Sequence, residues 1–205
     1  CLLSRGLGDV YKRQVPNILT VFRILLTPVF IISLFSVHYL GHLLALVIFI
    51  IASITDAFDG YYARKYNQIS PEGEFLDPLA DKILVSSAFI SFAILGVIEY
   101  WMVALIIFRD LFITGLRMII ESKGKSMKTS NIAKAKTASQ MSIIIFILTF
   151  LGFKGFSISW AIPIFNFIKN YQLIYNFTLL VSLFTAITGF SYIYSNRYLI
   201  KEVMN

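Results

Sequence analysis

Long apolar runs separated by short polar connections dominate this chain. A transmembrane helix needs about 20 mostly apolar residues, because the hydrocarbon core of a bilayer is about 30 Å thick. The runs that reach this length are 17–37, 42–63, 76–97, 100–121, 134–153 and 171–194. We therefore predict an all-α, polytopic membrane protein with six transmembrane helices.

One further apolar segment, 153–169, is interrupted by Gly155 and Pro163. A proline inside a helix removes a backbone hydrogen bond and clashes with the preceding turn. We therefore predict a re-entrant or interfacial piece on the outer side of the membrane, and no seventh span.

The composition and the placement of charge agree with a lipid environment. Of the residues, 58% are hydrophobic and 14% are charged, whereas a soluble domain carries about 25% charged residues. The connections 38–41 and 96–101 contain no Lys or Arg, unlike most other connections and the C-terminal tail. The positive-inside rule then predicts both termini in the cytoplasm. The net charge of +7 fits topology and anionic headgroups, and we expect no nucleic-acid partner.

The first fourteen residues differ from the rest in composition and contain no Met. We interpret 1–14 as a non-native N-terminal scar and 15–205 as a single membrane domain. Cys1 is the only cysteine of the chain, so an internal disulfide is excluded.

Four aspartates recur at helical spacing across the second and third predicted spans. Asp56 and Asp59 share a face of one helix, and Asp77 and Asp81 share a face of the next. Four carboxylates are costly in a membrane unless they are compensated. Hard cations such as Mg²⁺ or Mn²⁺ take oxygen ligands and are often shared with substrate phosphates. We therefore expect the four acids to bind divalent metal, and two ions could polarise a phosphoryl group.

Small and basic residues accompany these acids. Gly60 and Ala63 would let a bulky group approach the helix closely, and the guanidinium of Arg64 suits phosphate. The alternative is that the acids cap helices or pair with Arg64 and Lys82. Four acids at helical spacing, with two small residues and an Arg between them, favour the metal site.

The pattern D-x2-D-G-x2-A-R-x8-G-x3-D-x3-D, from Asp56 to Asp81, resembles the signature of the CDP-alcohol phosphotransferase family. The resemblance implies that family's six-helix fold, a homodimer, and metal bound by Asp56, Asp59, Asp77 and Asp81. It further implies that Asp81 is the general base. The residues implied for CDP-diacylglycerol binding are Asn17, Thr20, Asp56, Asp59, Gly60, Ala63, Arg64 and Gly73.

A second, basic set of residues points to the acceptor. Arg109 lies inside an apolar run, where an ionisable side chain is a functional candidate, and Arg117 follows two turns later. Lys134, Lys136 and Thr137 begin the fifth run, where free backbone N–H groups favour phosphate. We expect an anionic acceptor, for which glycerol 3-phosphate is suitable. The alternative is that these cations anchor the topology or extend to the headgroups.

Three further patterns are similar to the bacterial phosphatidylglycerophosphate synthases within that family. They are P-N-x-L-T-x2-R from Pro16, R-D-x6-R from Arg109, and K-x-K-T-x2-Q from Lys134. The resemblance implies transfer of the phosphatidyl group of CDP-diacylglycerol to glycerol 3-phosphate at the cytoplasmic side of a bacterial inner membrane. One alternative is a cardiolipin synthase that uses phosphatidylglycerol. Another, from a different class, is a cation transporter with intramembrane acids, although no repeat symmetry is evident.

Overall fold

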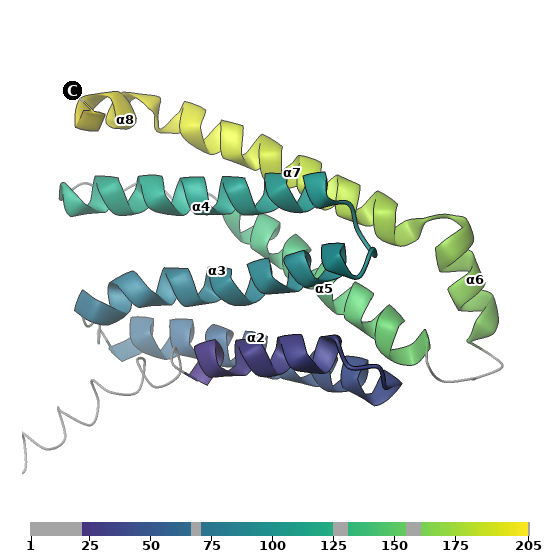
Figure 1. Ribbon diagram of the computed structural model, residues 1–205. Helices are drawn as coiled ribbons and strands as arrows, with labels where there is room; N and C mark the ends of the chain where they lie inside the picture. The colour runs from purple at the N-terminus through teal and green to yellow at the C-terminus, as the bar shows by residue number, and fades with distance from the viewer. Residues whose placement is uncertain (1–21, 67–70, 125–130, 155–160, 205) are drawn as a thin grey trace, which may run out of the picture. The chain divides into compact units, whose positions relative to one another are not determined.

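The computed structural model describes residues 22–66, 71–124, 131–154 and 161–204. Within these ranges every regular element is a helix (Figure 1). The chain divides into two compact units, Cys1–Ser87 and Ala88–Asn205. The prediction of an all-α protein is confirmed for the described residues, whereas segment 1–14 lies outside them.

The helices follow the predicted apolar runs closely. The first described helix is Phe22–Leu34. The others are α2 (Tyr39–Tyr66), α3 (Pro71–Ile94), α4 (Tyr100–Ser122), α5 (Asn131–Lys154), α6 (Ile162–Asn170), α7 (Leu173–Ser195) and α8 (Arg197–Met204). Each of the six predicted spans falls on one of these helices, and the two short helices α6 and α8 are additional.

Two helical stretches among the described residues are long and apolar enough to cross a membrane, Lys134–Lys154 and Leu173–Ser195. Helix α4 has 23 residues, but Arg109, Asp110 and Arg117 interrupt its apolar run. The number of six spans therefore stays a prediction.

In the first unit, a tight reversal connects helix Phe22–Leu34 to α2. Gly41 lies at this turn, and a Cβ atom placed there would come within 2.4 Å of the Ser36 Cβ atom. Any larger residue at this position would push the two segments apart. Beyond the turn Phe30 packs against Phe49, with ring centroids 5.9 Å apart.

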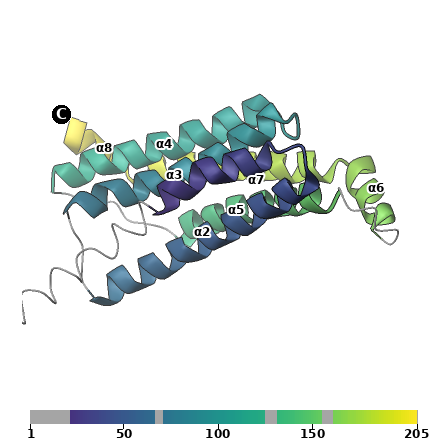
Figure 2. The ribbon, with the colours of Figure 1, turned by 60° about the horizontal axis from the view of Figure 1, so that its bottom comes forward.

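In the second unit, α7 is the central packing element, since α4, α5 and α6 all lie against it (Figure 1, Figure 2). The buried side of α7 is mostly polar or small, and consists of Thr178, Ser182, Thr185, Thr188, Gly189 and Tyr192. Its exposed side includes large apolar residues, among them Leu180, Leu183, Ile187 and Phe190. This arrangement inverts the pattern of a soluble protein and suits a helix that faces lipid and packs through small and hydroxyl-bearing residues.

The two short helices complete the second unit. Helix α6 has nine residues, which is too short to cross a bilayer and agrees with the prediction that 153–169 is no seventh span. Helix α8 was not predicted. Its Leu199 and Ile200 pack against the buried side chains of Ile113, Ile120 and Tyr192.

Candidate functional site

The four predicted metal-binding aspartates lie on two helices of the structure. Asp56 and Asp59 belong to α2, and Asp77 and Asp81 belong to α3. A helical backbone keeps each pair about one turn apart on a common face, as the spacing predicts. Each helix therefore offers two carboxylates, and a donor set made only of oxygens fits Mg²⁺ or Mn²⁺. The side chains themselves lie outside the described residues, so metal binding stays a prediction.

The contacts of the remaining predicted donor-binding residues also stay predictions. Gly60, Ala63 and Arg64 lie on α2 and Gly73 lies near the start of α3, where only the helical backbone is described. Asn17 and Thr20 precede the described residues. Their proposed contacts with CDP-diacylglycerol remain predictions from the sequence.

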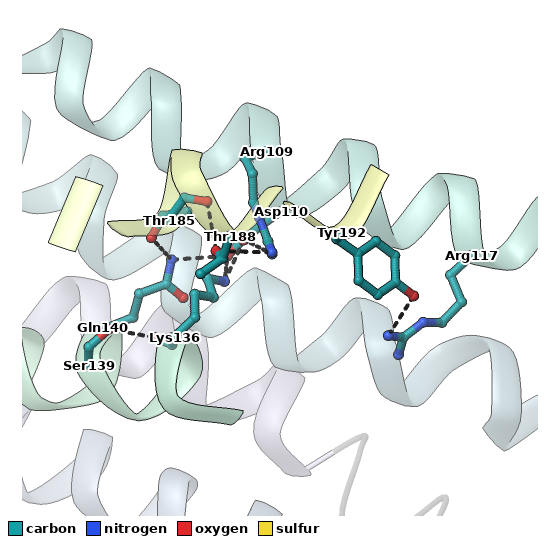
Figure 3. A network of polar contacts seen from close by, with 9 residues as sticks. All are labelled: Arg109, Asp110, Arg117, Lys136, Ser139, Gln140, Thr185, Thr188 and Tyr192. Carbon is teal, nitrogen blue, oxygen red and sulfur yellow. Dashed lines mark hydrogen bonds and ion pairs between the residues drawn. The ribbon is translucent and has the colours of Figure 1, made fainter. Parts of the chain in front are cut away.

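A buried polar network around Asp110 joins α4, α5 and α7 (Figure 3). The Lys136 ammonium donates hydrogen bonds to both carboxylate oxygens of Asp110. Arg109 Nη1 donates to Asp110 Oδ1 at 3.2 Å, and Gln140 Nε2 donates to Asp110 Oδ2 at 3.2 Å. Asp110 and Lys136 are only 4% and 2% exposed. The network thus holds charged groups almost completely away from solvent.

Helical spacing explains why these side chains meet. Lys136 and Gln140 are one turn apart on α5, so both project from one face. Arg109 and Asp110 are adjacent on α4 and come together at the packing surface with α7. Three helices are therefore required to assemble the network, although each contributes a short stretch of sequence.

Helix α7 supplies hydroxyl groups and space. Thr188 Oγ1 accepts a hydrogen bond from Arg109 Nη2 at 3.3 Å and donates one to the Thr185 carbonyl oxygen at 2.9 Å. Thr185 Oγ1 accepts a longer bond from Gln140 Nε2 at 3.5 Å. A Cβ atom on Gly189 would lie 2.9 Å from Arg109 Cγ. Glycine at this position therefore lets the Arg109 side chain lie against α7.

The electrostatics of the network favour an anion. Its described ionised groups are two cations, Arg109 and Lys136, and one carboxylate, Asp110, which leaves an excess of one positive charge. In addition, Arg109 Nε is buried and has no hydrogen-bond partner among the described residues. Buried donors are costly when unpaired, and charge-assisted bonds to an anionic group would use them.

Arg117 occupies a separate place from this network (Figure 3). Its Nη2 donates to the hydroxyl of Tyr192 on α7 at 3.2 Å, and its guanidinium carbon lies 5.8 Å from the centroid of that ring. Tyr192 is buried, and its hydrogen bond with Arg117 is partly buried. Arg117 is therefore fixed by an aromatic hydroxyl, whereas Arg109 is fixed by a carboxylate.

The predicted acceptor-binding residues are thus brought together only in part. Arg109 and Lys136 share one partner, and Arg117 is held by another. Lys134 is exposed and Thr137 is half-buried, which places both outside the buried core of the network. Their roles in acceptor binding stay predictions.

Sequence reasoning did not identify the hydroxyl groups that support these cations. Thr185, Thr188 and Tyr192 recur at intervals of three and four residues along an otherwise apolar run. Such spacing places polar groups on one side of a membrane helix, where they bond to neighbouring helices. This periodicity is the signal that could have revealed the α7 contribution.

Comparisons with known proteins agree with the family resemblance that the sequence motifs indicate. The sequence model of the CDP-alcohol phosphatidyltransferase family matches residues 13–193. A CDP-diacylglycerol–glycerol-3-phosphate 3-phosphatidyltransferase of Bacillus subtilis is 40% identical over 140 residues, which cover 62% of this chain and 72% of the relative. The protein of that name from Rickettsia bellii is 36% identical over 180 residues, covering 87% and 93%. A probable phosphatidylglycerophosphate synthase of Mycobacterium tuberculosis is 39% identical over 149 residues, covering 71% of each.

Proposed function

The chain belongs to the CDP-alcohol phosphatidyltransferase family, and from this premise we propose that it transfers the phosphatidyl group of CDP-diacylglycerol to sn-glycerol 3-phosphate. The products are phosphatidylglycerophosphate and CMP. The observation that carries the proposal is the 36% identity with the Rickettsia bellii protein, whose name specifies this reaction, over 93% of its length. The buried cationic network adds a physical reason, because it suits an acceptor that bears a phosphate.

The donor side of the reaction rests on the aspartates. Divalent metal ions, held by Asp56, Asp59, Asp77 and Asp81, would polarise the reacting phosphoryl group and stabilise the departing CMP. The small residues Gly60 and Ala63 leave room beside α2 for the cytidine. Further contacts with CDP-diacylglycerol come from Asn17, Thr20, Arg64 and Gly73.

Proton transfer and bond formation occur at the acceptor hydroxyl. Asp81 accepts the proton of the primary hydroxyl of glycerol 3-phosphate. The resulting oxygen attacks the phosphorus atom that bears the lipid, and the bond from this phosphorus to the CMP oxygen breaks. CMP leaves with the bonding electrons, while Arg64 offsets the charge that develops on it.

The acceptor side rests on the basic residues. Arg109, Arg117 and Lys136 bind the phosphate of glycerol 3-phosphate, and Lys134 and Thr137 contribute at the start of α5. When these residues bind the phosphate, they also hold the acceptor hydroxyl in position for attack. The acceptor therefore loses its translational and rotational freedom on binding and not in the chemical step. A neutral acceptor such as inositol would leave the positive excess of the network uncompensated.

The surroundings of the enzyme follow from the sequence and the family. The chain is a membrane protein. We propose that the protein crosses the bacterial inner membrane several times, with both termini and the reacting groups on the cytoplasmic side. The reason is that Lys and Arg concentrate in the connections that would face the cytoplasm.

We also propose a homodimer and two metal ions. Family membership favours an enzyme over the cation transporter considered from the sequence.

An acceptor panel tests the proposed reaction against its nearest rival. Purified protein with CDP-diacylglycerol and Mg²⁺ or Mn²⁺ would be offered glycerol 3-phosphate, phosphatidylglycerol, inositol phosphate or serine, and CMP release would be measured. We expect glycerol 3-phosphate to give the highest kcat/KM. A preference for phosphatidylglycerol would identify a cardiolipin synthase and overturn the proposal.

Tyr192→Phe should weaken acceptor binding by releasing Arg117. The substitution keeps the ring and removes only the hydroxyl that accepts from Arg117 Nη2. Because one hydrogen bond contributes about 0.5–1.5 kcal/mol, we expect the KM for glycerol 3-phosphate to rise about two- to tenfold. Steady-state kinetics at saturating CDP-diacylglycerol would measure the change.

The matched control is Tyr194→Phe, which removes a hydroxyl from an exposed tyrosine of the same helix. We expect this variant to keep the wild-type KM. An unchanged KM in Tyr192→Phe itself would show that the Arg117 contact does not support the acceptor site.

A further inference from the structure

Asp110 is a buried acid that the proposed reaction does not use. It lies between two cations assigned to the acceptor phosphate, Arg109 on its own helix and Lys136 on α5. Its two oxygens accept from Lys136, Arg109 and Gln140. A carboxylate with this many donors is fully engaged by the protein, so its role concerns the groups around it.

We propose that Asp110 is a positioning residue of the acceptor site, which holds Arg109 and Lys136 in the arrangement that binds the phosphate of glycerol 3-phosphate. The inference rests on the proposed function and deepens it. Asp110 acts through these two cations and does not touch the substrate or the reacting atoms.

Charge explains why a carboxylate is needed between these cations. Two like charges buried close together repel each other. Asp110 offsets this repulsion, because its carboxylate contacts both Arg109 and Lys136. Because the described residues of the cluster supply one carboxylate for two cations, they keep a positive excess, which suits an anionic acceptor.

Flexibility gives the second reason. Lys and Arg side chains have many rotamers, and a site that fixes them before the substrate arrives binds it more tightly. Arg109 is fixed at two points, because Nη1 bonds to Asp110 and Nη2 bonds to Thr188. Its Nε is buried and has no hydrogen-bond partner among the described residues.

Asp110 is itself prevented from turning away. Gln140 Nε2 bonds to Asp110 Oδ2 and lies 3.5 Å from Thr185 Oγ1. The amide of Gln140 therefore connects the carboxylate to α7, as Figure 3 shows. This arrangement predicts that removing the amide weakens acceptor binding in the same direction as removing the carboxylate, although by less.

The test compares Asp110→Asn and Asp110→Glu with the wild type in the phosphatidyl-transfer reaction. We expect Asp110→Asn to raise the KM for glycerol 3-phosphate about ten- to a hundredfold, and to leave the KM for CDP-diacylglycerol within about twofold of the wild type. Asp110→Glu keeps the charge and should recover part of the loss. An unchanged KM for glycerol 3-phosphate, or equal rises for both substrates, would overturn the inference.

Two further variants keep the inference testable if Asp110→Asn does not fold. Gln140→Leu keeps every charge of the network, and we expect it to raise the KM for glycerol 3-phosphate about two- to tenfold; no rise would contradict the inference even if Asp110→Asn fails to fold. Ser182→Ala is the matched control, because its buried hydroxyl donates to the Leu179 carbonyl oxygen of the same helix, and it should behave as the wild type.

The same experiment separates this inference from the proposed function. If the wild type releases no CMP with glycerol 3-phosphate, the proposed function is wrong and the inference falls with it. If the wild type is active and Asp110→Asn keeps the wild-type KM for glycerol 3-phosphate, only the inference is wrong.

Discussion

Replacing Asp81 with Asn should lower turnover about a hundred- to ten-thousandfold, which is the usual contribution of a general base. An amide has nearly the same shape as a carboxylate but does not take the proton of the acceptor hydroxyl. Asp81 lies on α3, with Asp77 one turn before it, so the substitution also removes one proposed metal ligand. The measurement is CMP release at saturating CDP-diacylglycerol and glycerol 3-phosphate.

The control for this variant is Glu121→Gln, which neutralises an exposed acid near the end of α4. We expect it to keep the wild-type turnover. Both variants should elute from size-exclusion chromatography as the wild type does, which separates lost chemistry from lost folding. Near-normal CMP release by Asp81→Asn would exclude Asp81 as the base.

Lys136→Met should have the largest effect on stability. Lys136 is 2% exposed and its ammonium binds both oxygens of Asp110. Removing one partner of a buried ion pair costs about 3–5 kcal/mol where the other charge is left uncompensated. Because Arg109 and Gln140 still bind Asp110, we expect a loss near 3 kcal/mol. For a chain of this size the unfolding midpoint would fall by about 6–12 °C.

Two comparisons make this prediction specific to the ion pair. Lys134→Met removes an exposed cation two residues away on the same helix, and surface changes of this kind stay within about 0.5 kcal/mol. The double variant Lys136→Met with Asp110→Asn removes both charges and should recover part of the lost stability. Equal midpoints for Lys136→Met and Lys134→Met would contradict the buried pair.

The helices could be predicted from the sequence because lipid imposes a minimum length on apolar runs. The run 100–121 became α4 (Tyr100–Ser122), and 171–194 became α7 (Leu173–Ser195). Helix α8 was missed because its eight residues are too few to give a membrane signal and lie in a charged tail. Its contribution depends on Leu199 and Ile200 meeting side chains from distant positions.

The sequence predicted which residue types form the candidate site better than it predicted which side chains contact one another. The spacing of Arg109 and Arg117 places both on nearly one face of a helix, yet the structure gives them different partners. Asp110 binds Arg109, whereas Tyr192, which lies 75 residues beyond Arg117, accepts from Arg117. Pairings across such separations depend on how helices pack, and no local pattern on α4 carries that information.

The four aspartates, in contrast, could be identified from their local spacing. Their spacing and the family signature predict the donor chemistry from the sequence alone. The structure adds that Asp56 and Asp59 lie on α2, while Asp77 and Asp81 lie on α3. The family model and the relatives support the reaction. Metal binding by these acids still depends on the sequence prediction and on the chemistry of oxygen ligands.

The most direct test follows a radiolabel from glycerol 3-phosphate into lipid. Purified protein would be incubated with CDP-diacylglycerol, radiolabelled glycerol 3-phosphate and Mg²⁺ or Mn²⁺, with a chelator in a parallel sample. The account predicts labelled phosphatidylglycerophosphate and CMP in equal amounts, and neither product in the chelated sample. Release of CMP without label in the lipid, or no CMP release at all, would contradict it.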